Sequence, residues 1–247
     1  MKLICWNVNS VKQRLEHLES LIKNEDPDLI LLQEIKCETD KFPYMILDNY
    51  GYNFSVIGQK TFNGVAILSK YPIEEEVKIL PGYAIDDYDE QARFIEIGIT
   101  INKEYWRIIS VYVPNGQSLD SDKYIYKLKF YQRLEKYLAD TNSTEDNLVI
   151  AGDFNVSNEN IDLYDPQKFK NQILSLFRYL NTNIKLIYKY RKQICSEPPE
   201  VKARFHLQVS RTIITLKWKM TGHSIQLSSR ISIHHCITTT HKWLMIK

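Results

Sequence analysis

Four polar residues stand at the ends of apolar runs that are typical of β-strands. Asn7 ends the first run, Glu34 follows a second, and Asp153 and Asn155 follow a third. Strand ends are where α/β folds gather their binding groups. Carboxylates from Glu34 and Asp153, helped by amide oxygens, would make a hard oxygen site suited to Mg²⁺ or Mn²⁺. Any single one of these residues could equally cap a helix or face solvent in a turn, so the hypothesis depends on all four together.

The elements that must position these residues follow from hydrophobic periodicity. Short apolar strands are predicted at 2–8, 29–32, 65–68, 106–113 and 148–151, and an alternating strand at 94–101. Helical spacing predicts one helix from Val11 to Ile22 and another over 122–138, and a further helix is expected to begin near Pro166. Strands and helices mix without the regular alternation of a parallel barrel. We therefore expect an α/β fold, a sandwich of two mixed β-sheets flanked by helices.

The predicted helix over 122–138 has a defined apolar side. It is formed by Ile125, Leu128, Tyr131, Leu134 and Leu138. This spacing predicts that these five side chains pack against the core.

Composition excludes several classes of protein. The chain has 247 residues, of which 44% are hydrophobic, yet no apolar run reaches the length of a membrane span, so we expect no membrane partner. The first ten residues lack the pattern of a signal peptide. Four scattered cysteines form no C-x-x-C pair, which argues against a zinc site or a disulfide framework. We expect reduced thiols and a cytoplasmic monomer.

The charge of the chain changes abruptly near residue 165. Residues 1–165 hold 17 Lys and Arg against 28 Asp and Glu, a net charge of −11, whereas residues 166–247 hold 15 against 2, a net charge of +13. No Asp follows Asp165, no acidic residue follows Glu200, and five of the six His lie beyond residue 200. Only one glycine, Gly222, follows Gly152, which leaves little turn chemistry there.

Five short motifs occur in a fixed order in the first two thirds of the chain. They are Cys5-Trp6-Asn7-Val8-Asn9-Ser10-Val11, Leu32-Gln33-Glu34-Ile35-Lys36, Gly64-Val65-Ala66-Ile67-Leu68-Ser69, Tyr112-Val113-Pro114-Asn115-Gly116 and Gly152-Asp153-Phe154-Asn155-Val156. Their order resembles that of exonuclease III and its abasic-site endonuclease relatives. The segments Gln91-Ala92-Arg93 and Asp162-Leu163-Tyr164-Asp165-Pro166 resemble that family too. Asn9-Ser10 and the Tyr-x-Pro-Asn-Gly pattern favour its bacterial branch within the wider endonuclease/exonuclease/phosphatase superfamily.

The resemblance implies a Mg²⁺- or Mn²⁺-dependent DNA repair phosphodiesterase. Its activities would be abasic-site endonuclease and 3′-to-5′ exonuclease on duplex DNA. Glu34 would bind the metal with Asn7 beside it, and Asp153 would act as acid or base while also facing the metal. Asn155 would orient the scissile phosphate or help hold the metal.

Three further residues would act on the DNA itself. The phenol of Tyr112 would donate to a phosphate oxygen and steady the transition state. Arg93 and Asn115 would contact the DNA backbone and position it without reading its sequence. The alternatives are a core tyrosine with a satisfied hydroxyl for Tyr112 and a surface ion pair for Arg93.

The resemblance covers only about residues 1–170, which we expect to be an exonuclease III-like catalytic region. The family also uses an Asp in an Arg-Ile-Asp strand and the Asp and His of a Ser-Asp-His motif, and this sequence has neither. We assign these roles to none of four C-terminal histidines, His223, His234, His235 and His241.

Residues 171–247 thus form an aberrant basic C-terminal region, for which two explanations are open. One is a divergent domain that binds DNA phosphates through its charge. The other is a shift of reading frame around residues 170–200, after which the residues were never selected to fold natively. The missing acidic residues and glycines, the clustered histidines and the Ile, Thr and Ser bias favour the frameshift.

An impaired enzyme is the expectation that follows. Losing a general base typically costs on the order of 10²- to 10⁴-fold in rate. Two alternatives remain open: a catalytically dead DNA-binding remnant, and a phosphodiesterase of the same superfamily that acts on a small molecule or a lipid.

Overall fold

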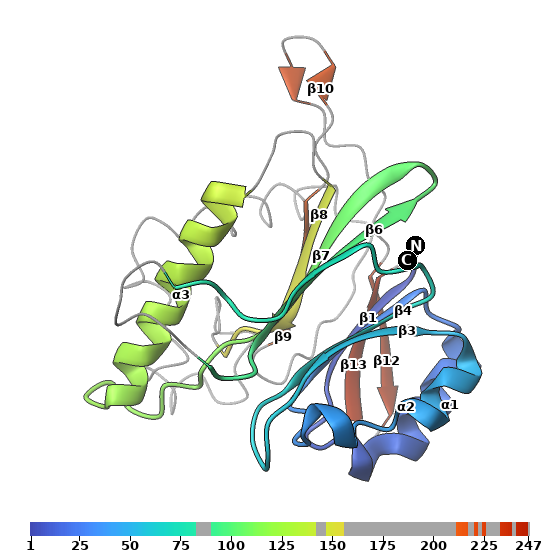
Figure 1. The fold of residues 1–247 in the computed structure, drawn as a ribbon, viewed down its shortest axis with the longest axis horizontal. Helices are drawn as coiled ribbons and strands as arrows, with labels where there is room; N and C mark the ends of the chain where they lie inside the picture. The colour runs from blue at the N-terminus through green and yellow to red at the C-terminus, as the bar shows by residue number, and fades with distance from the viewer. Residues whose placement is uncertain are drawn as a thin grey trace.

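The fold is a sandwich of two mixed β-sheets with helices on both outer faces (Figure 1). The computed structural model describes residues 1–82, 90–141 and 147–155, together with the backbone of five strands between 211 and 246. The α/β sandwich predicted from the sequence is confirmed.

The first sheet has six strands in the order β12-β13-β1-β2-β4-β3. Its strands are β1 (Leu3–Asn7), β2 (Leu29–Gln33), β3 (Asn53–Ile57), β4 (Val65–Ser69), β12 (Ile233–Thr238) and β13 (His241–Ile246). Strands β1 and β2 are parallel, and the other neighbours are antiparallel. The carboxyl ends of β1 and β2 therefore meet at one edge of the sheet.

The second sheet has five strands in the order β5-β6-β7-β8-β9. Its strands are β5 (Glu75–Val77), β6 (Phe94–Ile101), β7 (Glu104–Tyr112), β8 (Asn147–Asp153) and β9 (Arg211–Leu216). Strands β7 and β8 are parallel, so their carboxyl ends also lie together. A separate pair is formed by β10 (Met220–Thr221) and β11 (Ser224–Ile225).

In the part of the chain that the structure describes, three helices cover the two sheets. Helices α1 (Leu15–Glu25) and α2 (Tyr44–Leu47) lie on the outer face of the first sheet, and α3 (Asp122–Thr141) lies on the outer face of the second (Figure 1). Short 3-10 turns at Lys12–Arg14, Thr39–Lys41 and Asp48–Tyr50 connect them to the strands. In the described part of the chain, no helix is long and apolar enough to cross a membrane.

Three apolar clusters fill the layers. One lies between the sheets, one between the first sheet and α1 and α2, and one between the second sheet and α3. The alternating isoleucines of β6 face the layer between the sheets, as their spacing predicts: Ile95, Ile97, Ile99 and Ile101. This central layer locks one sheet against the other and so fixes the distance between residues at their neighbouring edges.

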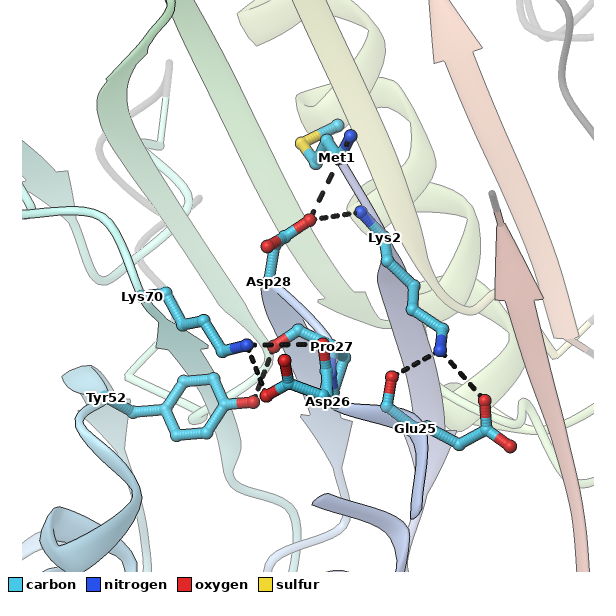
Figure 2. Close-up of polar contacts among 8 residues, drawn as sticks. All are labelled: Met1, Lys2, Glu25, Asp26, Pro27, Asp28, Tyr52 and Lys70. Atoms are coloured by element: carbon cyan, nitrogen blue, oxygen red, sulfur yellow. Dashed lines mark hydrogen bonds and ion pairs between the residues drawn. The ribbon is translucent and has the colours of Figure 1, made fainter. Parts of the chain in front are cut away.

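Polar contacts at the far end of the first sheet set its register (Figure 2). The Asp28 carboxylate accepts the backbone N–H of Lys2 at 2.6 Å, and the backbone N–H of Asp28 returns a bond to the Lys2 carbonyl. Lys70 donates to the Asp26 carboxylate at 2.5 Å, and the Tyr52 hydroxyl donates to the carbonyl of the proline between the two aspartates. In this register Leu3 lies opposite Leu29 and Asn7 lies opposite Gln33. Asn7 is therefore next to Glu34, the residue that follows Gln33.

Helix α3 buries three of the five residues predicted for its core side, Tyr131, Leu134 and Leu138, but not the first of them. Its first predicted core residue, Ile125, is 55% exposed, whereas Lys127 is 1% exposed. The buried positions are Lys127, Phe130, Tyr131, Arg133, Leu134, Tyr137 and Leu138. The apolar spacing included Ile125 and left out Lys127 because it did not count a lysine as a buried residue.

The C-terminal third is described only in part. Strand β9 pairs with β8 in the second sheet, while β13 pairs with β1 and β12 pairs with β13 in the first, so these strands extend both sheets. The helix expected near Pro166, the segment 162–166 and the greater part of 171–247 lie outside the described residues. The division at residue 170 and the frameshift therefore stay predictions.

Candidate active site at the strand ends

One amide nitrogen joins the two carboxylates that the sequence singled out. Asn7 Nδ2 donates to Glu34 Oε1 at 2.6 Å and to Asp153 Oδ2 at 2.9 Å. The two carboxylate oxygens thus cannot be further apart than these bonds laid end to end, about 5.5 Å. Asn7 and Glu34 come from the first sheet and Asp153 from the second. The packing of the sheets therefore brings together residues 146 positions apart.

The backbone at Glu34 is held in a conformation that non-glycine residues rarely adopt. Its φ is 53°, in the left-handed region. Three backbone hydrogen bonds fix the segment. The Glu34 carbonyl accepts the N–H of Ser10 at 2.8 Å. The N–H groups of Ile35 and Lys36 donate to the carbonyls of Gly64 at 3.2 Å and of Asn63 at 3.0 Å. Such strain persists where the surroundings over-determine it, and it is concentrated at functional sites.

The Glu34 carboxylate is ionised at neutral pH. Burial alone would raise its pKa, but hydrogen bonds from Asn7 and Lys36 and the charge of Lys36 outweigh burial, so the pKa of Glu34 lies below its usual value. The Lys36 ammonium lies 3.0 Å from Glu34 Oε2 and also donates to the Asn9 side chain. Glu34 therefore carries a negative charge on the side of the site that faces Asp153.

Asp153 is 5% exposed and both of its oxygens are oriented. Oδ2 accepts from Asn7, and Oδ1 accepts the backbone N–H of Asn155 at 3.0 Å. Gly152 allows β8 to approach β7 closely here, since a Cβ at this position would lie 2.0 Å from the Val111 carbonyl oxygen. Tyr112 and Asp153 consequently stand opposite each other in the two parallel strands.

Asn155 and Asn115 lie together at the ends of β8 and β7. Asn115 Nδ2 donates to Asn155 Oδ1 at 3.2 Å, and Asn155 Nδ2 donates to the Val113 carbonyl at 2.7 Å. The φ of Asn155 is 48°, another left-handed backbone position. The two loops that follow β7 and β8 are therefore tied to each other.

Tyr112 and Arg93 complete this edge of the second sheet. The Tyr112 hydroxyl is hydrogen-bonded with Glu34, and burial, followed by the charge of Glu34, raises its pKa, so the phenol stays protonated. The Arg93 guanidinium lies 4.8 Å from the centre of the Tyr112 ring, and its Nε donates to Gln91 Oε1 at 2.8 Å. The structure brings Asn7, Glu34, Tyr112 and Asp153 together, and places Arg93 against Tyr112.

Three supporting contacts of the site were not predicted from the sequence. Gln33, 0% exposed, donates from Nε2 to Ser110 Oγ at 3.1 Å and so joins β2 to β7 beneath the site. Lys127 and Tyr131 of α3 reach the loop after β8 from behind. The sequence signal for Lys127 was its helical spacing, three, four and seven residues before Phe130, Tyr131 and Leu134, which places it on the same buried side of α3.

The donor set fits a hard divalent cation. Two carboxylates on facing sheet edges, joined by one side-chain amide NH₂ group, are the type of oxygen ligand that Mg²⁺ prefers. The Asn7 amide oxygen accepts the backbone N–H of Asn9 at 3.1 Å, so this amide presents nitrogen to the carboxylates. Among the described residues, no third His, Cys, Asp or Glu joins them in a metal-binding group. Direct ligation by Asn7 and Asn155 stays a prediction.

A family model for the endonuclease/exonuclease/phosphatase family matches residues 4–221, well over half of the chain. The chain belongs to this family. Its sequence relatives are DNA repair nucleases. Exodeoxyribonuclease III of Haemophilus influenzae is 36% identical over 164 residues, and the exodeoxyribonuclease of Bacillus subtilis is 29% identical over 174. A DNA-(apurinic or apyrimidinic site) endonuclease of Dictyostelium discoideum is 29% identical over 177 residues.

These sequence matches cover only part of this chain and only part of each relative. They cover 66%, 69% and 69% of this chain but only 60%, 65% and 46% of the three relatives. The chain thus matches less than two thirds of their length.

Solved structures match over the whole chain. A Neisseria 3′ phosphatase bound to a product DNA hairpin aligns with a TM-score of 0.78 and 28% identity, covering 100% of this chain and 98% of that one. An AP endonuclease from Archaeoglobus fulgidus aligns with a TM-score of 0.78 and 26% identity, with the same coverage.

Proposed function

We propose that this chain is a Mg²⁺- or Mn²⁺-dependent DNA repair phosphodiesterase, an abasic-site endonuclease with 3′-to-5′ exonuclease activity on duplex DNA. The observation that carries the proposal is the single Asn7 nitrogen that joins Glu34 to Asp153 across the two sheets. The likeness to exonuclease III and to AP endonucleases supports DNA as the substrate. The enzyme would act as a monomer in the cytoplasm.

The residues of the site divide the work of phosphodiester hydrolysis. When bound, Mg²⁺ supplies positive charge that offsets the charge developing on the phosphate. Glu34 and Asp153 would provide the carboxylates that hold it, and Asp153 would also give or take a proton at the attacking water or the leaving oxygen. Asn155 orients the scissile phosphate. Because Tyr112 stays protonated, its hydroxyl can donate to a phosphate oxygen in the transition state.

Arg93 and Asn115 would contact the DNA backbone beside the scissile phosphate. Arg93 is braced by the Tyr112 ring and by Gln91, and Asn115 by Asn155. A side chain whose position is fixed before binding loses less entropy when it engages a phosphate. These two residues therefore position the substrate.

The missing C-terminal Asp and Asp-His motifs lead us to propose slow turnover. The chain retains the metal-side carboxylates but has no acidic residue after Glu200. A rate on the order of 10²- to 10⁴-fold below that of an intact relative follows from the missing Asp-His motif, which would supply the general base.

The test is metal-dependent nicking of an abasic-site duplex, beside H. influenzae exodeoxyribonuclease III as the intact relative. We expect slow nicking in Mg²⁺, none in EDTA, and none in Glu34→Gln or Asp153→Asn. Glu16→Gln, which changes an exposed carboxylate on α1, is the matched control and should nick like the unchanged chain. Nicking at the relative's rate would contradict the impairment, and duplex binding without any nicking would favour the DNA-binding remnant. Turnover of inositol phosphates or sphingomyelin alone would favour the small-molecule or lipid phosphodiesterase.

A further inference from the structure

Helix α3 places a buried ammonium directly behind the two loops of the site. Lys127 is 1% exposed, and its Nζ donates to the Asn155 carbonyl at 2.6 Å and to the Asn115 carbonyl at 3.2 Å. These two residues follow β8 and β7, and their side chains are hydrogen-bonded to each other at 3.2 Å. One side chain of α3 thus joins both loops through their backbones.

A second residue of α3 binds the backbone carbonyl that precedes the Asn155 carbonyl. The Tyr131 hydroxyl donates to the Phe154 carbonyl at 2.5 Å. Residues four apart on a helix lie on the same face, so Lys127 and Tyr131 bind consecutive carbonyls of one loop. The carbonyls of 154 and 155 are thereby turned toward α3, which leaves the Asn155 N–H aimed at Asp153 Oδ1, 3.0 Å away.

A buried cation at this position does not serve the packing of the helix. Taking an ammonium out of water is costly unless it is well hydrogen-bonded, and an apolar side chain would suit the stripe formed by Phe130, Tyr131 and Leu134. Burial accordingly lowers the pKa of Lys127 to about 8, against the opposing charge of Asp153. The bonds that compensate for this burial go to the loops of the site.

We propose that Lys127, with Tyr131, is a positioning residue that fixes the loops presenting Asp153, Asn155 and Asn115 to the substrate phosphate. This inference rests on the proposed phosphodiesterase function. Because many phosphate contacts contribute to DNA binding, loosening these loops affects the transition state more than substrate affinity. The effect therefore falls on kcat and leaves KM nearly unchanged.

The test compares Lys127→Met with Lys129→Met, which removes an exposed lysine from the same helix. We expect Lys127→Met to lower kcat for abasic-site nicking about 10- to 100-fold with KM within about 3-fold. Lys127→Arg, which keeps the charge and the donors, should recover part of the loss, and Lys129→Met should match the unchanged chain. A fall in kcat that Lys127→Arg does not relieve, or an equal effect of Lys129→Met, would overturn the proposal.

Hydrogen exchange separates this inference from the proposed function. In Lys127→Met, amides of 113–117 and 153–155 should exchange faster while those of β6 do not change, whether or not the chain turns over DNA. Unchanged exchange in both loops refutes the positioning role even if nicking is observed. Absent nicking in the unchanged chain refutes only the proposed activity. Should Lys127→Met not fold, Tyr131→Phe is the second variant, and its amides at 153–155 should exchange faster. Unchanged exchange in Tyr131→Phe would likewise refute the positioning role.

Discussion

Replacing Asn7 by leucine tests the geometry on which the site depends. Leucine has the shape of asparagine but cannot donate a hydrogen bond, so the change removes both bonds of the Asn7 nitrogen and leaves the carboxylates of Glu34 and Asp153 facing each other. In EDTA we expect the Asn7→Leu chain to be less stable, because two acceptors lose their shared donor.

The magnitude follows from the environment of the two acceptors. A hydrogen bond to a charged group contributes about 1.5–3 kcal/mol, so two such bonds set an upper range of about 3–6 kcal/mol. Asp153 is 5% exposed, but the Glu34 side chain is 20% exposed, so water replaces part of what Glu34 loses. We therefore expect the free energy of unfolding to fall by about 2–4 kcal/mol.

Urea unfolding with and without Mg²⁺ measures this effect. A ligand that binds only the folded state adds about 1.4 kcal/mol at ten times its dissociation constant. Mg²⁺ should therefore stabilise both the unchanged chain and Asn7→Leu, and it should not stabilise the double variant Glu34→Gln/Asp153→Asn. Asn24→Leu, at an exposed position of α1, is the control and should lie within about 0.5 kcal/mol of the unchanged chain.

Two results would refute the reasoning. If Asn7→Leu in EDTA were as stable as Asn24→Leu, the bonds of Asn7 would contribute nothing to the fold. If the double variant gained as much stability from Mg²⁺ as the unchanged chain, the cation would bind elsewhere.

Three further predictions follow from other contacts. Arg107 makes a buried bidentate pair with Glu96, so Arg107→Met should lower the free energy of unfolding by about 3–5 kcal/mol in urea titrations; a change below about 1 kcal/mol would contradict the pair's role. The pKa of Glu34 lies below its usual 4.5, so the interactions of its carboxylate stabilise the fold above pH 4.5 and are lost as the pH falls through the lower pKa of the folded state. Glu34→Gln should therefore make the free energy of unfolding in EDTA depend less on pH on the acid side. An unaltered dependence would contradict this role of Glu34. Tyr112→Phe should slow nicking about 10²-fold at unchanged folding, measured by nicking rates beside circular dichroism, and an unchanged rate would assign the hydroxyl to packing alone.

The sequence was sufficient for the family and for the strands β1, β2, β7 and β8, whose ends carry the site. Ordered motifs placed Glu34 and Asp153 after strands, and alternation over 94–101 identified β6 and its buried face. These features are local, since the period of the apolar residues follows directly from the geometry of a strand or a helix. The family match confirms the resemblance on which the nuclease prediction depended.

What only the tertiary structure decided is how distant residues meet. The bond between Asn7 and Asp153 spans 146 positions and depends on the packing of one sheet on the other, which no local pattern encodes. The burial of Lys127 in the first turns of α3 depends on the carbonyls that it reaches, since a lysine is buried only where partners for its ammonium already stand. The sequence thus determined which residues could do chemistry, and the packing of the layers determined which of them lie within bonding distance.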